Sequence, residues 1–83
     1  MANTSPRGRN HKARLLEVER ILYMRTNERR RLTMFEIVEA LGLERTENNA
    51  RNVRNDIKVL RAYGRPIATE RHKAEEYFWA GKR

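Results

Sequence analysis

Amide and cationic side chains gather on one face of a helix predicted over residues 46–63. At about 100° per residue, the face opposite the apolar stripe of this helix carries Asn48, Arg51, Asn52, Asn55 and Lys58. Asn and Arg can pair bidentately with adenine and guanine edges in the major groove of DNA, which is wide enough to admit a helix. The pattern predicts a recognition helix whose base-reading residues are Asn48, Arg51, Asn52 and Asn55.

A merely solvated face is the alternative interpretation of this pattern. Ordinary solvated faces mix Glu with Lys and seldom carry several Asn, because Asn is a poor helix former. Asn48 and Asn49 lie near the expected start of the helix, where amides can cap free N–H groups. Asn52 and Asn55 lie in the middle of the predicted helix, where they have no capping role. Because they lower helix stability there, their presence favours a role in reading DNA.

A surplus of positive charge accompanies this helix. Lys and Arg number 19 against 11 Asp and Glu, so the 83 residues carry a formal net charge of +8. Such a surplus on a small domain attracts polyanions such as nucleic acid. The side chains expected to hold DNA phosphates are Arg7, Arg9, Lys12, Arg45, Arg54, Lys58, Arg71, His72 and Lys73.

The helix needs a core to hold it, and its apolar stripe supplies one side of that core. Ala50, Val53, Ile57 and Leu60 recur at i, i+3, i+7 and i+10. Residues from His11 to about Thr26 predict a first helix with a matching apolar face, formed by Leu15, Val18, Ile21 and Leu22. Residues 27–31, NERRR, are expected to be an exposed connector.

A capping pattern predicts a short second helix. Thr33 and Glu36 have the spacing of a capping box, and Leu32 and Ile37 stand at the positions of a hydrophobic staple, so a helix begins at Met34. Its apolar face consists of Phe35, Ile37, Val38 and Leu41. Gly42 follows as a left-handed cap. A short helix, a turn with Gly and a longer basic helix make a helix-turn-helix pattern.

The residues after the recognition helix predict a two-stranded hairpin. Gly64 and Pro66 end the helix, and residues 67–70 and 77–80 then alternate with the period of strands. A basic loop containing Arg71, His72 and Lys73 joins them. The hairpin is either a wing whose tip contacts phosphate or a plain cover over the core, and both roles can hold at once.

Residues 1–10, MANTSPRGRN, show no apolar period and are expected to form a flexible basic arm. Basic arms can follow the DNA backbone or enter the minor groove. An ordinary frayed terminus has the same composition, and both interpretations stay open. Residues 11–83 are assigned to a single domain because of their length.

Residue types needed for catalysis or metal binding are scarce. Cys is absent, which excludes disulfides and thiolate ligands. His11 and His72 lack clustered carboxylates, and phosphate-loop, dinucleotide-binding and HExxH motifs are missing. We therefore expect no enzyme, no cofactor and no metal. Apolar runs of at most four residues predict no membrane span, and the lack of Cys fits a cytoplasmic protein.

Residues 55–67, NDIKVLRAYGRPI, followed after a gap by EYFW, resemble the winged helix-turn-helix domain that begins many WYL-domain and DeoR-like bacterial transcription regulators. The resemblance covers about residues 15–80. Its matching residues are Asp56, Ile57, Leu60, Gly64, Pro66, Ile67 and Tyr77. It implies a bacterial or phage DNA-binding regulator with the second helix of the motif in the major groove.

Two features depart from that family pattern. The loop between Leu43 and Asn49 is longer than the usual tight turn. Glu75 and Glu76 replace the glycine pair of the wing and add negative charge. The wing is therefore expected to contact DNA only through residues 71–73.

The predicted fold is mainly α with a small β-hairpin (α+β), a winged helix-turn-helix of three helices and a two-stranded wing. The protein is expected to be a transcriptional regulator that binds double-stranded DNA sequence-specifically. We expect a repressor, because so small a protein has little surface left to recruit polymerase. One such module covers about 600 to 1,000 Å² of protein surface. A homodimer is therefore expected at least on DNA, with Val59 and Tyr63 as candidate contacts unless they pack beneath the wing.

Two other functions fit the composition. A protein-interaction module, such as an anti-repressor or a phage-type inhibitor, could use the same scaffold to bind an acidic partner. The Asn-rich face argues against it, because Trp, Tyr and Arg dominate protein hot spots. Double-stranded RNA is disfavoured, because a helix cannot enter its deep, narrow major groove.

Overall fold

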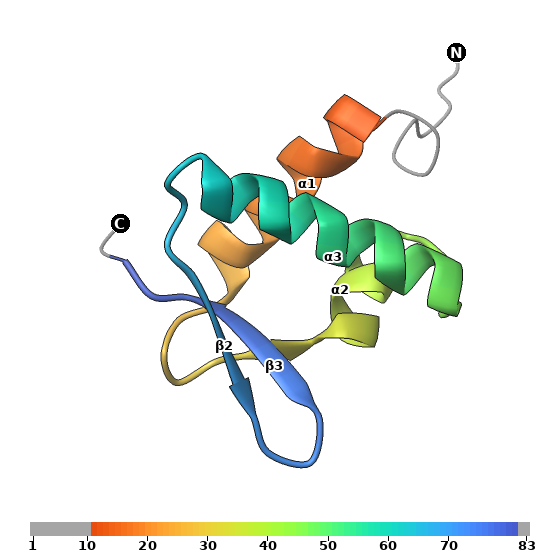
Figure 1. Cartoon of the computed structure of the whole chain (residues 1–83). Coiled ribbons are helices and arrows are strands. Elements are labelled where there is room, and N and C mark those ends of the chain that lie inside the picture. The colour runs from red at the N-terminus through yellow and green to blue at the C-terminus, as the bar shows by residue number, and fades with distance from the viewer. Residues whose placement is uncertain (1–10, 82–83) are drawn as a thin grey trace.

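Three helices and a small antiparallel sheet form the part of the chain that the computed structural model describes, residues 11–81. The expected arm at residues 1–10 lies outside this range. The elements follow in the order α1 (His11–Arg25), β1 (Leu32–Thr33), α2 (Met34–Ala40), α3 (Glu47–Ala62), β2 (Ile67–Arg71) and β3 (Glu75–Trp79) (Figure 1). This α+β arrangement has the topology of a winged helix, as the sequence predicted.

The sheet has three strands in the order β1-β3-β2, so the two-stranded wing was an incomplete prediction. β2 and β3 form the expected hairpin, with Ile67 opposite Trp79 and Arg71 opposite Glu75. β1 adds to the free edge of β3, with Leu32 opposite Tyr77. A strand of two residues is too short to show an alternating pattern, which explains why the sequence did not reveal it.

The start of α2 confirms the predicted capping box. The hydroxyl oxygen of Thr33 accepts a hydrogen bond from the backbone N–H of Glu36 at 3.3 Å, and the Glu36 carboxylate accepts one from the N–H of Thr33 at 2.7 Å. After α2 the chain turns at Gly42, whose φ of 79° lies in the left-handed region. Both ends of this short helix are therefore determined locally.

The core lies between the three helices and the inner face of the sheet. All four residues of the α3 stripe are buried, and they belong to one core with Val18, Ile21 and Leu22 of α1, Ile37 and Val38 of α2, and Leu41 directly after α2. In Figure 1, α3 crosses the helical half of the molecule, and the wing extends away from it. The apolar stripe of α3 therefore faces the core, and the opposite face of the helix is directed towards the solvent.

A buried threonine joins the end of α1 to the sheet. Thr26 is fully buried, and its hydroxyl donates to the carbonyl of Leu22 at 2.5 Å while accepting the backbone N–H of Trp79 at 2.8 Å. The ring of Trp79 packs edge-on against Tyr23 of α1, with centroids 5.0 Å apart. These contacts hold the base of the wing against the helices.

Candidate nucleic-acid interface

The N-terminus of α3 is held by Thr46, whose hydroxyl accepts the backbone N–H of Asn49 at 3.1 Å. The side-chain amide of Asn49 donates a hydrogen bond to the backbone carbonyl of Glu44 at 2.8 Å, which ties the long loop before α3 to the first turn of the helix. Asn49 is therefore used structurally. Asn48 is exposed and takes no part in this cap.

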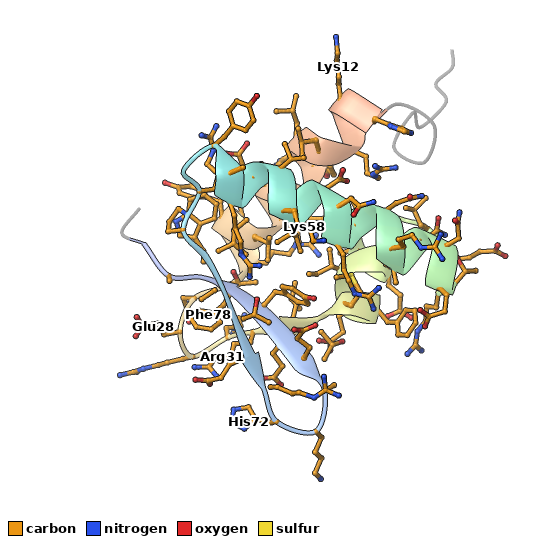
Figure 2. The ribbon with its side chains drawn as sticks, in the orientation of Figure 1. Lys12, Glu28, Arg31, Lys58, His72 and Phe78 are labelled. Carbon is orange, nitrogen blue, oxygen red and sulfur yellow. The ribbon has the colours of Figure 1, made fainter. Side chains whose placement is uncertain are left out.

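The outward face of α3 presents Arg51, Asn55 and Lys58, and all three side chains are exposed. Figure 2 labels Lys58 on the middle turns of the helix. Within residues 11–81, these three side chains form no hydrogen bond or ion pair with the protein. Two cations and an amide are thus available to an external partner.

Asn52 differs from its neighbours because it is half-buried. It lies four residues before Asp56, so both are on the same side of α3. Asp56 faces α1, since its carboxylate binds Arg14 of that helix. Asn52 therefore lies at the α1 edge of the exposed face, and Arg51 and Asn55 lie at its centre.

The opposite edge of α3 faces the wing. Arg61 donates from Nε to the carbonyl of Ile67 at 2.7 Å and from its terminal nitrogen to the hydroxyl of Thr69, so it ties the helix to β2. Arg54 lies seven residues earlier on the same side and is exposed. It lies close enough to Tyr77 of β3 to influence the pKa of that phenol. A cation is therefore positioned where the helix meets the wing.

Glu75, one of the two carboxylates expected to add negative charge to the wing, is hydrogen-bonded to the phenol that lies near Arg54. Tyr77 donates a hydrogen bond to the carboxylate of Glu75 at 2.9 Å. Burial raises the pKa of Tyr77, the Glu75 carboxylate raises it further, and Arg54 opposes both. Arg54 is thus close to a phenol that a carboxylate already engages.

Arg45 is only partly available for phosphate. Its guanidinium lies 3.5 Å from the carboxylate of Glu39 and 5.3 Å from the ring centroid of Phe35. Phe35 was predicted in the apolar face of α2, but it is only partly buried and packs at the edge of the core. Arg7 and Arg9, the remaining predicted phosphate contacts of the arm, lie outside the described residues, and Lys12 is exposed on the first turn of α1 (Figure 2).

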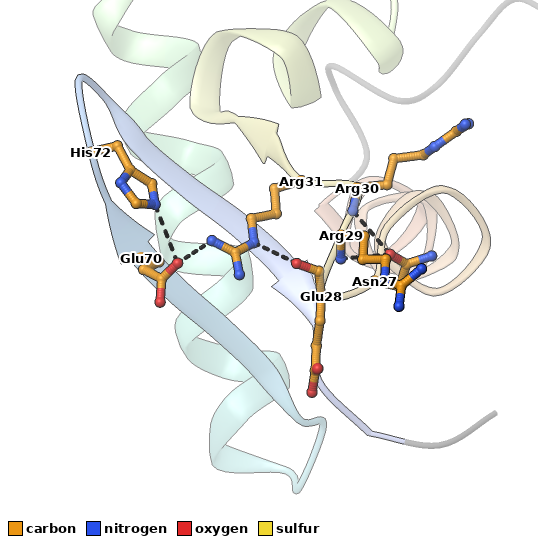
Figure 3. Close-up of polar contacts among 7 residues, drawn as sticks. All are labelled: Asn27, Glu28, Arg29, Arg30, Arg31, Glu70 and His72. Carbon is orange, nitrogen blue, oxygen red and sulfur yellow. Dashed lines mark hydrogen bonds and ion pairs between the residues drawn. The ribbon is translucent and has the colours of Figure 1, made fainter.

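The outer face of the sheet carries a cluster that the sequence did not reveal. Arg31, expected to belong to an exposed connector, stacks over the ring of Phe78 with its guanidinium carbon 4.4 Å from the centroid. Its terminal nitrogen donates to the carboxylate of Glu70, which also lies 3.3 Å from the imidazole of His72 (Figure 3). Phe78 is therefore covered by Arg31 on the face of the sheet away from the core.

This cluster divides the basic loop of the wing. His72 contacts Glu70, so it is engaged within the wing. The side chains of Arg71 and Lys73 are exposed and form no hydrogen bond or ion pair within the described chain. Because Arg31 offsets the charge of Glu70, the wing tip keeps its positive character.

The charge pairing around Glu70 gives a pH-dependent prediction. The hydrogen bond from Arg31 lowers the pKa of Glu70, and the charge of Arg31 and the bond to His72 lower it further. A lowered folded-state pKa stabilises the fold above the ordinary carboxyl pKa, and this contribution is lost as the pH falls through the lowered value. We expect the Arg31→Gln variant to raise the titration midpoint of the Glu70 carboxyl carbon in NMR spectra. The same midpoint in both proteins would contradict the pairing.

Comparison of the chain with protein-family models, with curated proteins and with solved structures finds no match. No helix within residues 11–81 is long and apolar enough to cross a membrane. The same residues contain no cluster of three or more His, Asp or Glu that could hold a metal ion. The class of protein is therefore defined by the fold alone: it is a winged-helix-like domain whose α3 exposes cationic and amide side chains.

Proposed function

We propose that this protein is a transcriptional regulator that binds double-stranded DNA sequence-specifically and acts as a repressor. The main support is the division of α3 into two faces: a fully apolar stripe in the core, and Arg51, Asn55 and Lys58 exposed on the outward side. A helix with such a face has the side chains and the size to enter a major groove. Repression by occupying a site needs no surface beyond this interface.

Each group has a role in the proposed complex. Arg51 and Asn55 read base edges at the centre of the contact, with Asn48 towards the N-terminus of α3 and Asn52 at the α1 edge. Phosphates are held by Lys58 and Arg54 on the helix and by further cations around it, namely Lys12, Arg45, Arg71 and Lys73. Base contacts supply sequence preference, and phosphate contacts supply affinity for any duplex.

The division of roles is testable with two variants of similar exposure. We expect Asn55→Ala to remove about 1 to 3 kcal/mol of preference for a selected duplex over a random one, because one base contact is lost. Lys73→Ala weakens binding to both duplexes alike, because a phosphate contact carries no sequence information. The duplex is first selected from a random library, and fluorescence anisotropy then measures each affinity.

The matched control is Arg29→Ala, which removes one exposed positive charge from the loop between α1 and β1. Arg29 is exposed and lies beside Asn27 and Arg30, away from His72 at the wing tip (Figure 3). We expect its loss to change affinity less than the loss of Lys73. Equal effects of Asn55→Ala and Lys73→Ala on selected and random DNA would overturn the role assignment, and stronger binding to an RNA duplex would overturn the proposed function.

A further inference from the structure

An apolar patch remains exposed where α1 packs beside α3. Leu16, Val59 and Tyr63, with exposed fractions of 63, 43 and 77%, are three of the four large apolar side chains left exposed in residues 11–81. They line one hollow of about 280 Å³. Neither Val59 nor Tyr63 packs beneath the wing, so we name these three residues the α1–α3 patch.

The α1–α3 patch is electrically balanced on a strongly basic protein. The two charged residues that line the hollow, Glu19 and Arg65, pair with each other at 2.5 Å. A neighbouring hollow shares Leu16, Glu19 and Arg65 with the first and continues along α1 over Arg20, Tyr23 and Met24. Two copies of a chain with net charge +8 repel each other through most of their surfaces. Because the charges that border the patch cancel, the patch adds no net charge to that repulsion.

We propose that the α1–α3 patch joins two copies of this protein about a twofold axis that passes beside Tyr63. A twofold contact requires one surface to fit itself, and an apolar patch bordered by one anion and one cation does so. The purpose of this contact rests on the proposed function, because a dimer would place two recognition helices on paired half-sites. The surface itself is defined without reference to DNA.

The position of the patch along α3 suits that purpose. Arg51 lies twelve residues before Tyr63, which is about 18 Å along a helix at 1.5 Å per residue. Two helices that meet near Tyr63 can therefore hold their Arg51 side chains up to about 36 Å apart, and successive major grooves on one side of DNA are separated by about 34 to 36 Å. Arg51, Asn55 and Lys58 of the outward face do not line the hollow of the patch.

The size of the patch predicts a weak dimer. Stable interfaces bury about 800 Å² on each partner, and three exposed apolar side chains provide only part of such an area. The free protein therefore dimerises weakly, and two adjacent half-sites strengthen the contact by raising the effective concentration of the second copy.

A single introduced cysteine tests the contact, because the natural chain has none. Tyr63→Cys places a thiol in the patch, and Ala74→Cys is the matched control, since Ala74 is exposed in the turn between β2 and β3 and lines neither hollow. With copper–phenanthroline as oxidant, we expect Tyr63→Cys to form disulfide-linked dimers faster by about tenfold or more, because a docked copy offers its thiol at an effective millimolar concentration. Adding Leu16→Gln to Tyr63→Cys is expected to reduce the rate to that of the control.

The outcomes separate this proposal from the proposed function. Faster cross-linking of Tyr63→Cys in the absence of DNA supports the twofold contact even if duplex binding is not detected. A further increase on a duplex with two selected half-sites, but not on one with a single half-site, supports both. Equal rates for Tyr63→Cys and Ala74→Cys with and without duplex would overturn the contact while leaving duplex binding intact.

Discussion

Replacing Asp56 with alanine is expected to lower the free energy of unfolding by about 3 to 5 kcal/mol, the usual result of breaking one side of a buried ion pair. The carboxylate of Asp56 accepts hydrogen bonds from Nε of Arg14 at 2.5 Å and from its terminal nitrogen at 3.0 Å. Both side chains are more than 90% buried. The variant therefore leaves a guanidinium without its partner in a place that water scarcely reaches.

This loss is large for so small a domain, whose total stability is expected to be roughly 4 to 12 kcal/mol. Each kcal/mol shifts the Tm of a domain of this size by about 4 to 8 °C. Urea or thermal unfolding followed by circular dichroism measures the change. The partner substitution Arg14→Met combined with Asp56→Leu is expected to recover most of the stability, because no charge then remains buried. A loss below about 1 kcal/mol for Asp56→Ala would show that Arg14 finds water instead.

The pair also bears on the proposed DNA contact. Asp56 follows Asn55 in α3, and Arg14 lies near the start of α1. Their bond raises the pKa of Arg14 and fixes the rotation of α3 about its axis relative to α1. The orientation of the outward face therefore depends on a contact between residues that are 42 positions apart in the chain.

Features that depend on neighbours within one or two turns were predicted from the sequence. The capping box of Thr33 and Glu36, the left-handed Gly42 and the buried stripe of α3 all follow from local spacing and residue type. Their confirmation shows that short-range hydrogen bonding and helical period determine the element boundaries here.

Contacts between distant residues were not predictable in the same way. Nothing in the local sequence pairs Arg14 with Asp56, Arg31 with Phe78, or Thr26 with the backbone of Trp79. In each case a polar residue that local patterns assign to solvent is used to bind a second element. A charged residue in a loop or on a helix therefore cannot be assigned to a ligand until the fold shows what lies beside it.

The same limit applies to the candidate site. Helical period placed Asn52 with Arg51 and Asn55, but the proximity of α1 leaves Asn52 half-buried. His72 was grouped with Lys73 as a phosphate contact. Its imidazole instead contacts Glu70 of β2, the strand that leads into the loop. The sequence identified the residue types of the surface, and the packing of α1 and the wing determines how far each is exposed.

Salt is expected to have the largest effect on the proposed DNA binding. Neutralising four to six phosphates gives a slope of log K against log salt of about −4 to −5, because each contact releases condensed counterions from the duplex. Raising the salt concentration from 50 to 200 mM then weakens binding by about 250- to 1,000-fold. The exposed cations Lys58, Arg54, Arg71 and Lys73 are sufficient in number for the lower end of this range.

The individual variants give this slope its structural meaning. Lys73→Ala is expected to reduce its magnitude by about 1, because one phosphate contact is lost, while Asn55→Ala leaves it unchanged, because a neutral amide displaces no counterion. Fluorescence-anisotropy titrations of one labelled duplex at several salt concentrations measure both effects. Affinity that stays constant from 50 to 200 mM would exclude phosphate contacts as the basis of binding, and with them the positioning of α3 that the base-reading residues require.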